Sequence, residues 1–101
     1  MLMACDIGNT SVAFGVFEGR TLVREWRLRS DRDQTSDEYG VILLNLLRMA
    51  GIDPAAVKAG IISCVVPPLT PVFQELCGSL FGVRPFVVGP GLRTGMPILY
   101  D

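Results

Sequence analysis

A short polar segment at residues 6–10, Asp-Ile-Gly-Asn-Thr, interrupts an apolar start and carries the residue types needed to hold phosphate groups. Asp6 puts a carboxylate where an apolar strand should continue, which costs desolvation unless a cation or hydrogen bonds meet it. Such a carboxylate can hold Mg²⁺, usually through water, and Mg²⁺ is carried in on nucleotide phosphates. Gly8 lets the backbone approach a phosphate, and the three following residues offer amide and hydroxyl donors. The segment is therefore predicted to be a phosphate-binding turn.

A plain hairpin turn, capped by Asp6 and binding nothing, explains the same five residues equally well. Single short motifs match by chance often enough that local sequence does not separate the two interpretations. The order of the surrounding elements favours the phosphate-binding interpretation, because the motif joins the first two of the predicted strands.

Three strands are predicted at the start of the chain. Residues 2–7 and 11–17 are β-prone apolar runs, and Gly-Asn between them favours a hairpin because both residues tolerate positive φ. Glu-Gly-Arg at 18–20 supplies a second turn. Residues 21–29 then alternate apolar and polar, which predicts a third strand with one wet face.

Helical spacing takes over behind this meander. Residues 35–38, Thr-Ser-Asp-Glu, fit a capping box, and the apolar positions that follow predict a helix ending at Gly51. Asp53-Pro54 begins a short turn through Val57. The remaining predictions are a buried strand over 59–66, broken by two prolines, a helix over about 69–80, a strand over 86–88 and an extended piece over 98–100.

The resulting order is three antiparallel strands, then helix, strand, helix, strand. This is the α/β layout of a ribonuclease H-like mixed sheet. Neither an internal repeat nor a linker divides the chain, so residues 1–101 are interpreted as one nucleotide-binding domain. Half of the residues are apolar and only 19% are charged, which favours a piece whose apolar faces pack against material outside it.

Charge and composition exclude several function classes. The net charge is −1 without a basic stripe, so nucleic-acid binding is not expected. No apolar run reaches the length of a membrane span and no signal peptide opens the chain, so a cytoplasmic protein is expected. Cys5, Cys64 and Cys77 are expected to be reduced, buried thiols. With no histidine, His-ligated metals and His-activated nucleophiles are excluded within these residues.

Several other polar features favour a structural interpretation. Residues 27–33 carry charged side chains of both signs, which is typical of a solvated loop: Arg27, Arg29, Asp31, Arg32 and Asp33. Ser63 ends a buried strand and favours a satisfied strand-end hydroxyl over a ligand. Gly89-Pro90-Gly91 lacks the Lys-Ser/Thr of a P-loop and favours a structural turn. Trp26 is expected to cover the sheet edge.

Taken in order, the motifs of the whole chain resemble the N-terminal part of type III pantothenate kinases. The resemblance begins with the phosphate motif and the Phe-Gly-Val-Phe that follows it. It continues through Glu-Trp-Arg-Leu at 25–28, Asp-Glu-Tyr-Gly at 37–40 and the Ile-Ile-Ser-Cys-Val-Val-Pro-Pro-Leu-Thr run at 61–70. Phe-Gly-Val-Arg-Pro at 81–85, Val-Gly-Pro-Gly at 88–91 and the Thr-Gly…Pro-Ile-Leu-Tyr end complete it.

This resemblance implies one half of a duplicated actin-like kinase fold, with the active site between two ribonuclease H-like halves. It implies ATP-dependent phosphorylation of pantothenate, the first step of coenzyme A synthesis, and a homodimer for the full-length protein. Mg²⁺ would accompany ATP at Asp6, and a monovalent cation, K⁺ or NH₄⁺, would bind outside this chain. The matching residues for the ATP phosphates are Asp6, Ile7, Gly8, Asn9, Thr10, Ser11, Val12 and Ala13.

Tyr100 matches the tyrosine that lines the family's pantothenate site. The family's proposed base, the aspartate of a Gly-Ala-Asp-Arg segment, would follow Asp101, so no catalytic residue is assigned here. The chain is accordingly expected to be a truncated N-terminal domain that lacks the second domain and is inactive by itself. A non-catalytic nucleotide-binding module of the same fold is the competing hypothesis, and a sugar or other small-molecule kinase sharing the turn is a third.

Overall fold

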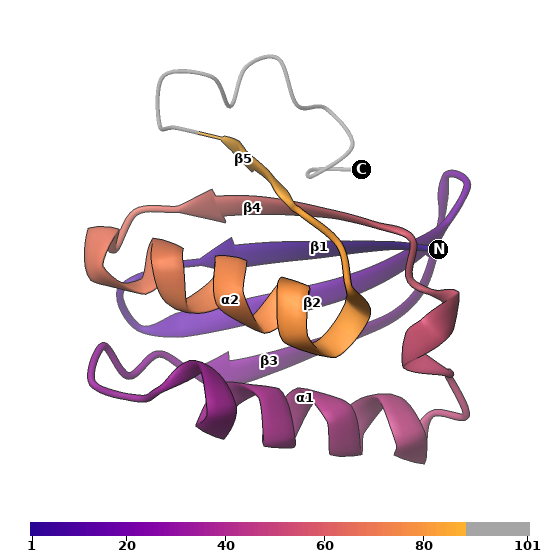
Figure 1. Ribbon diagram of the computed structural model, residues 1–101, viewed down its shortest axis with the longest axis horizontal. Coiled ribbons are helices and arrows are strands. Elements are labelled where there is room, and N and C mark those ends of the chain that lie inside the picture. Colours follow the sequence, from indigo (N-terminus) through magenta and orange to yellow (C-terminus); the bar gives the residue numbers. More distant parts are fainter. Residues whose placement is uncertain (89–101) are drawn as a thin grey trace.

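The computed structural model describes residues 1–88, which form one mixed five-stranded sheet with helices packed on it (Figure 1). The strand order is β3-β2-β1-β4-β5. β1, β2 and β3 are antiparallel neighbours, whereas β4 runs parallel to both β1 and β5. The strands are β1 (Leu2–Ile7), β2 (Ser11–Glu18), β3 (Thr21–Arg29), β4 (Ala59–Cys64) and β5 (Phe86–Val88). The predicted ribonuclease H-like mixed sheet is confirmed.

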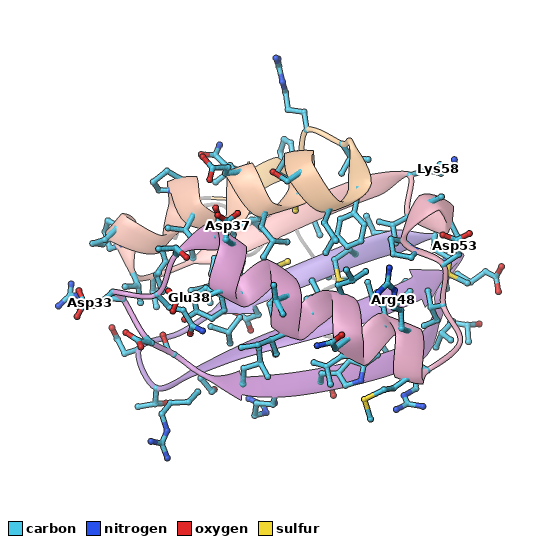
Figure 2. The ribbon with its side chains drawn as sticks, turned by 60° about the horizontal axis from the view of Figure 1, so that its bottom comes forward. Asp33, Asp37, Glu38, Arg48, Asp53 and Lys58 are labelled. Atoms are coloured by element: carbon cyan, nitrogen blue, oxygen red, sulfur yellow. The ribbon has the colours of Figure 1, made fainter. Side chains whose placement is uncertain are left out.

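Helix α1 (Ser36–Met49) begins at the predicted capping box. The Thr35 hydroxyl accepts from the backbone N–H of Glu38, whose carboxylate accepts from the backbone N–H of Thr35. Acidic Asp37 and Glu38 lie in the first turn and basic Arg48 in the last, as the helix dipole favours, and Figure 2 shows them at opposite ends of α1. Its charges and its cap therefore both fix where this helix starts and stops.

Helix α2 (Thr70–Phe81) follows a 3₁₀ turn, η2 (Pro67–Leu69), and ends at Gly82, which adopts a left-handed φ of 68°. A second 3₁₀ turn, η1 (Pro54–Ala56), links α1 to β4, with the Asp53 side chain accepting from the backbone N–H of Ala55. Both α-helices of the described residues lie along the same face of the sheet (Figure 1).

The core lies between that face and the two helices. Phe73 of α2 joins the layers, because its ring centroid lies 5.8 Å from that of Phe14 on β2 and 4.8 Å from that of Tyr39 on α1. All three side chains are fully buried. The core-facing side chains of β1 and β2 are equally inaccessible: Met3, Cys5, Ile7, Val12, Phe14 and Val16. We call this side of the sheet the covered face.

No helix of the described residues lies on the opposite side, which we call the open face. Strand alternation turns Asp6 and its register partners Ala13 and Ser63 to this side. Farther from the turn the open face becomes apolar, with Ala4 and Ile61 packed beside partly buried Leu2 and Phe17. The open face is therefore polar at the carboxyl ends of β1 and β4 and apolar at their amino ends.

Three predictions about local structure are corrected. β4 ends at Cys64 instead of Val66, because the backbone turns before Pro67 and Pro68 enter the η2 turn. Cys64 is only half-buried, unlike Cys5 and Cys77. Met49, the last of the apolar positions whose helical spacing predicts α1, is 83% exposed instead of buried or half-buried like the others.

The third strand matches its prediction in part. Trp26 and Leu28 pack against the core from the sheet edge while their neighbours are exposed, as alternation predicts. Earlier in β3 the pattern is broken, because the pairing with β2 shifts register between Val16 and Phe17 of β2, and Leu22 and Val23 are both exposed. Tyr100, the Gly89-Pro90-Gly91 turn and the extended piece over 98–100 lie outside the described residues.

Candidate functional site

The turn between β1 and β2 has the predicted position but a different internal geometry. The Gly8 N–H donates to the Ser11 carbonyl oxygen over 2.9 Å, so this donor is used within the turn. Neither Gly8 nor Asn9 has a positive φ, which corrects the reason given for Gly-Asn in the hairpin. A Cβ on Gly8 would lie 3.3 Å from the Ser11 carbonyl oxygen, closer than ordinary van der Waals contact. The close approach of the two backbone segments therefore favours glycine at position 8, because a Cβ there would need the Ser11 carbonyl to shift by a few tenths of an ångström.

The donors left for a ligand come from the tip of the turn. Among the described residues, the backbone N–H groups of Asn9 and Thr10 have no hydrogen-bond partner, and both residues are exposed. The Thr10 carbonyl oxygen accepts from the Ser30 N–H over 3.0 Å, which ties the tip to the segment after β3. The turn thus presents free donors from a backbone that is held on both sides.

Asp6 lies one residue before the end of β1 and is exposed on the open face. The desolvation cost expected from its apolar strand does not arise in this structure, because alternation places its carboxylate on the side that the described helices leave uncovered. Ser63 is its register partner on β4 and is half-buried. Among the described residues the Ser63 hydroxyl makes no hydrogen bond, so the predicted satisfied strand-end hydroxyl is not found there.

A concavity of about 220 Å³ lies on the open face beside Asp6. Small side chains form its floor, since Ala4, Ala13 and Gly15 occupy the middle of β1 and β2. Its remaining lining is Asp6, Phe17, Leu22, Glu25 and Arg27. The concavity therefore combines a carboxylate at the strand end with charged side chains from β3.

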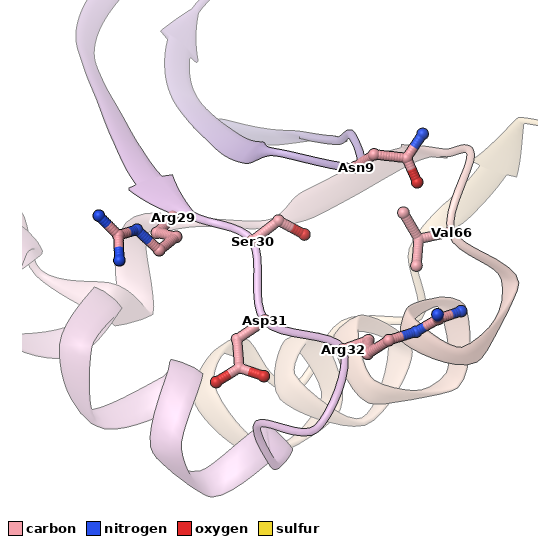
Figure 3. A pocket seen from close by; sticks show the side chains of 6 residues that line it. All are labelled: Asn9, Arg29, Ser30, Asp31, Arg32 and Val66. Atoms are coloured by element: carbon pink, nitrogen blue, oxygen red, sulfur yellow. The ribbon is translucent and has the colours of Figure 1, made fainter.

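A second cavity, of about 330 Å³, lies beside the turn tip (Figure 3). It is lined by Asn9, the segment from Arg29 to Arg32, and Val66. Figure 3 shows Asn9, Val66 and Arg32 around the cavity, whereas the Arg29 side chain extends away from them. The segment 27–33, predicted to be a solvated loop, thus contributes to the surroundings of the turn.

This segment is anchored by the buried ring of Tyr39. The Asp31 N–H donates to the Tyr39 hydroxyl over 2.8 Å, and the hydroxyl donates to the Asp31 carbonyl oxygen over 3.0 Å. Sequence reasoning missed the proximity of 27–33 to the turn, although one signal was available. The third strand is long enough to bring Arg29 into register with Ser11, the first residue after the turn.

The eight residues assigned to ATP phosphates therefore divide into two sets. Ile7 and Val12 have side chains fully buried on the covered face, so they can contact a ligand only through their backbone. The other six are exposed or half-buried along the turn and the open face: Asp6, Gly8, Asn9, Thr10, Ser11 and Ala13. Tyr100, assigned to the substrate, is outside the described residues.

Metal binding by protein groups alone has little support in the described residues. They contain no cluster of three or more His, Cys, Asp or Glu side chains placed to hold an ion. A single exposed carboxylate such as that of Asp6 fits Mg²⁺ instead, because this ion commonly binds through one or two carboxylates plus substrate phosphates. None of the helices in residues 1–88 is long and apolar enough to cross a membrane.

Comparison with known proteins gives a consistent result. Residues 2–101 match the family model for type III pantothenate kinase. The chain is 50% identical to the type III pantothenate kinase of Geobacter sulfurreducens and 52% identical to that of Pelobacter propionicus. Each match covers the whole chain but only 40% of the relative. The described fold resembles a hexokinase of the ROK class from Thermus thermophilus, with a TM-score of 0.64 and 16% identity over 87% of this chain and 33% of that one.

Proposed function

The chain belongs to the type III pantothenate kinase family, and on that premise we propose that it contributes the ATP-phosphate site of a pantothenate kinase. We use "the whole protein" for this chain together with any continuation that its gene encodes. The whole protein would phosphorylate pantothenate with ATP in coenzyme A synthesis. The family match over residues 2–101 and the 50% identity to a curated relative support this proposal. Because the chain spans 40% of that relative, the remaining part of the site would come from elsewhere in the whole protein.

One structural observation carries the assignment of the phosphate site. The turn at residues 8–10 presents two unpaired backbone N–H groups beside an exposed carboxylate, at the carboxyl end of β1. Ligands in open α/β sheets bind outside the carboxyl ends of the strands, so this is where a nucleotide is expected. In a phosphoryl transfer, positioning and charge stabilisation are most of what the protein supplies.

Each residue of the site has a distinct proposed role. The N–H groups of Asn9 and Thr10 would donate to oxygens of the β- and γ-phosphates, with the Thr10 and Ser11 hydroxyls as further donors. Asp6 would orient the Mg²⁺ that accompanies ATP, through water, and this ion would neutralise charge on the phosphates when bound. The buried Ile7 side chain would hold the strand end in place beneath the turn.

The other half of the active site is proposed from the family alone. Tyr100 would help to position pantothenate, and an aspartate outside this chain would accept the proton of its primary hydroxyl. Residues 1–101 would be the N-terminal domain of two, and the whole protein a homodimer that needs a monovalent cation. By itself the 101-residue chain is expected to form no phosphopantothenate, because one domain supplies neither the base nor a closed cleft.

The experiment compares the whole protein with residues 1–101 in a coupled assay for ADP release and by mass spectrometry of the product. We expect phosphopantothenate from the whole protein, dependent on both ATP and Mg²⁺, and none from the shorter chain. Glucose in place of pantothenate is the control for a sugar kinase. A whole protein that binds ATP but transfers no phosphate to pantothenate would instead support the non-catalytic nucleotide-binding module. Product from residues 1–101 would overturn the assignment of the base to a second domain.

A further inference from the structure

We propose that Arg27 of β3 is a phosphate-binding residue of this site and holds the polyphosphate of a nucleoside triphosphate against the turn. The inference rests on the proposed function, which places those phosphates at residues 6–13. It adds a cationic side chain from a strand that the sequence motif does not include. The family resemblance assigns no role to this residue, and the mixed charges of residues 27–33 predict a solvated stretch around it.

The register of the sheet brings Arg27 to the candidate site. Asp6 pairs with Ala13 across β1 and β2, and Ala13 pairs with Arg27 across β2 and β3, so the three form one row on the open face. Ala13 is small, and both charged side chains line the 220 Å³ concavity that contains it. Between Asp6 and Arg27 the sheet therefore offers space instead of a bulky side chain.

The Arg27 side chain extends along the open face toward the turn. Its Nη1 group donates to the Ser11 hydroxyl oxygen over 3.3 Å. Ser11 lies directly after the turn, so this contact places the guanidinium next to the donors assigned to phosphate. A guanidinium carries five N–H donors in a planar fork, and one long hydrogen bond leaves the others free. Arginine is suited to phosphate because that fork can donate two parallel hydrogen bonds.

The charges around the concavity also support a phosphate-binding role for Arg27. Asp6 and Glu25 are the acidic side chains that line it, and Arg27 is its basic one. A polyphosphate entering this space would meet two carboxylates, and Mg²⁺ would offset only part of their repulsion. The Arg27 guanidinium would supply the remaining positive charge on the protein's side of the phosphates.

The competing explanation is structural: Arg27 would only join β3 to β2 through Ser11. Arg24 provides a matched control, because it lies on the same strand, is exposed and carries the same charge. Its guanidinium is directed to the other side of the strand, 5.7 Å from the centroid of the Trp26 ring. A general loss of charge from β3 would affect both arginines, whereas phosphate binding would involve Arg27 alone.

The test measures ATP and pantothenate kinetics of the whole protein for Arg27→Gln, Arg27→Lys and Arg24→Gln. For Arg27→Gln we expect KM for ATP to rise about tenfold or more, as for loss of a charge-assisted hydrogen bond, with KM for pantothenate unchanged. Arg27→Lys should recover part of the loss, and Arg24→Gln should match the wild type. Isothermal titration should show the Arg27→Gln defect for ATP and only a small one for AMP.

Two results would overturn the proposal. One is an Arg27→Gln protein with a wild-type KM for ATP. The other is an equal loss of affinity for ATP, AMP and pantothenate together with a lower unfolding temperature, which indicates a structural role. Titration with ATP also separates this inference from the proposed function. A wild-type protein that binds ATP but phosphorylates no pantothenate contradicts the proposed function, and the ATP affinities of the variants still decide the role of Arg27.

Discussion

The two faces of the sheet use the same strands for different purposes. On the covered face, three alternate positions of β1 and three of β2 carry fully buried apolar side chains. On the open face, between those positions, β1 and β2 carry Asp6, Ala13 and Gly15, which are charged or small. Residues that stabilise the fold and residues of the candidate site therefore alternate along the same strands, on opposite faces of the sheet.

This separation explains how an exposed turn can be held in place. Ile7 and Val12 flank the turn, and burial of each side chain is worth about 1.5–3 kcal/mol. The covered face thus fixes the two strand ends while the open face keeps Asp6 accessible. Substitutions on the two faces should accordingly change different measurable quantities.

The largest expected effect lies on the covered face. Phe73→Ala removes the ring that contacts both Phe14 and Tyr39 and should lower the free energy of unfolding by about 3–5 kcal/mol. Urea unfolding followed by circular dichroism measures this loss. Val41→Ala on α1, at a position that is 60% exposed, is the control and should change stability by less than about 0.5 kcal/mol. A loss below about 1 kcal/mol for Phe73→Ala would mean that this ring does not join the layers.

On the open face the expected effect is large for turnover and small for folding. Asp6→Asn keeps the size of the side chain but removes its charge, so kcat of the whole protein should fall about 100-fold, a typical cost of losing one electrostatic group at an active site. The free energy of unfolding should stay within about 0.5 kcal/mol, because Asp6 is exposed. Steady-state kinetics and urea unfolding are measured on the same preparation. Near-normal turnover would count against the role assigned to Asp6. A loss of stability would contradict the expectation that open-face substitutions change turnover and not folding.

The smallest expected effect is a pH dependence that belongs to the covered face. A hydrogen bond with Cys77 and burial raise the pKa of the Cys5 thiol well above its ordinary value. The unfolded chain therefore loses this proton first, at about pH 8.5. The Cys5 contribution to stability is complete below that pH and is lost as pH rises. The same hydrogen bond lowers the pKa of the Cys77 thiol, which acts in the opposite direction, so the net loss between pH 8 and 9.5 should be at most about 1 kcal/mol.

Denaturation at a series of pH values measures this slope. Cys5→Ala should flatten it, whereas Cys64→Ala should retain it, because Cys64 is half-buried at the end of β4. Equal slopes for the two variants would show that the buried thiol is not the titrating group.

Sequence reasoning was most successful where a structure depends on neighbouring residues. The bounds of β1 and β3, the Thr35 capping box and the position of the turn all follow from local patterns. The end of β4 was placed two residues late, because an apolar run does not reveal where its backbone hydrogen bonds stop.

The surroundings of the turn were harder to predict, because they depend on contacts between strands. Arg27 and Asp6 are brought together by two successive registers, which no single motif encodes. The role of Gly8 likewise depends on the Ser11 carbonyl oxygen, three residues away in sequence, which would lie 3.3 Å from a Cβ at position 8. The position of that oxygen follows from how the hairpin closes. The turn was therefore predicted at the right residues, but the expected positive φ is not what the turn uses.

The strand order has a consequence in time as well as in space. β1 pairs with β2 across a three-residue turn, and hairpins of this kind form in microseconds. β1 pairs with β4 only after the chain has passed through β2, β3, α1 and η1. Contacts distant in sequence form more slowly because the intervening chain must first be ordered. The turn between β1 and β2 should therefore form during the earliest stage of folding, before the helices that bury the other side of its strands have packed.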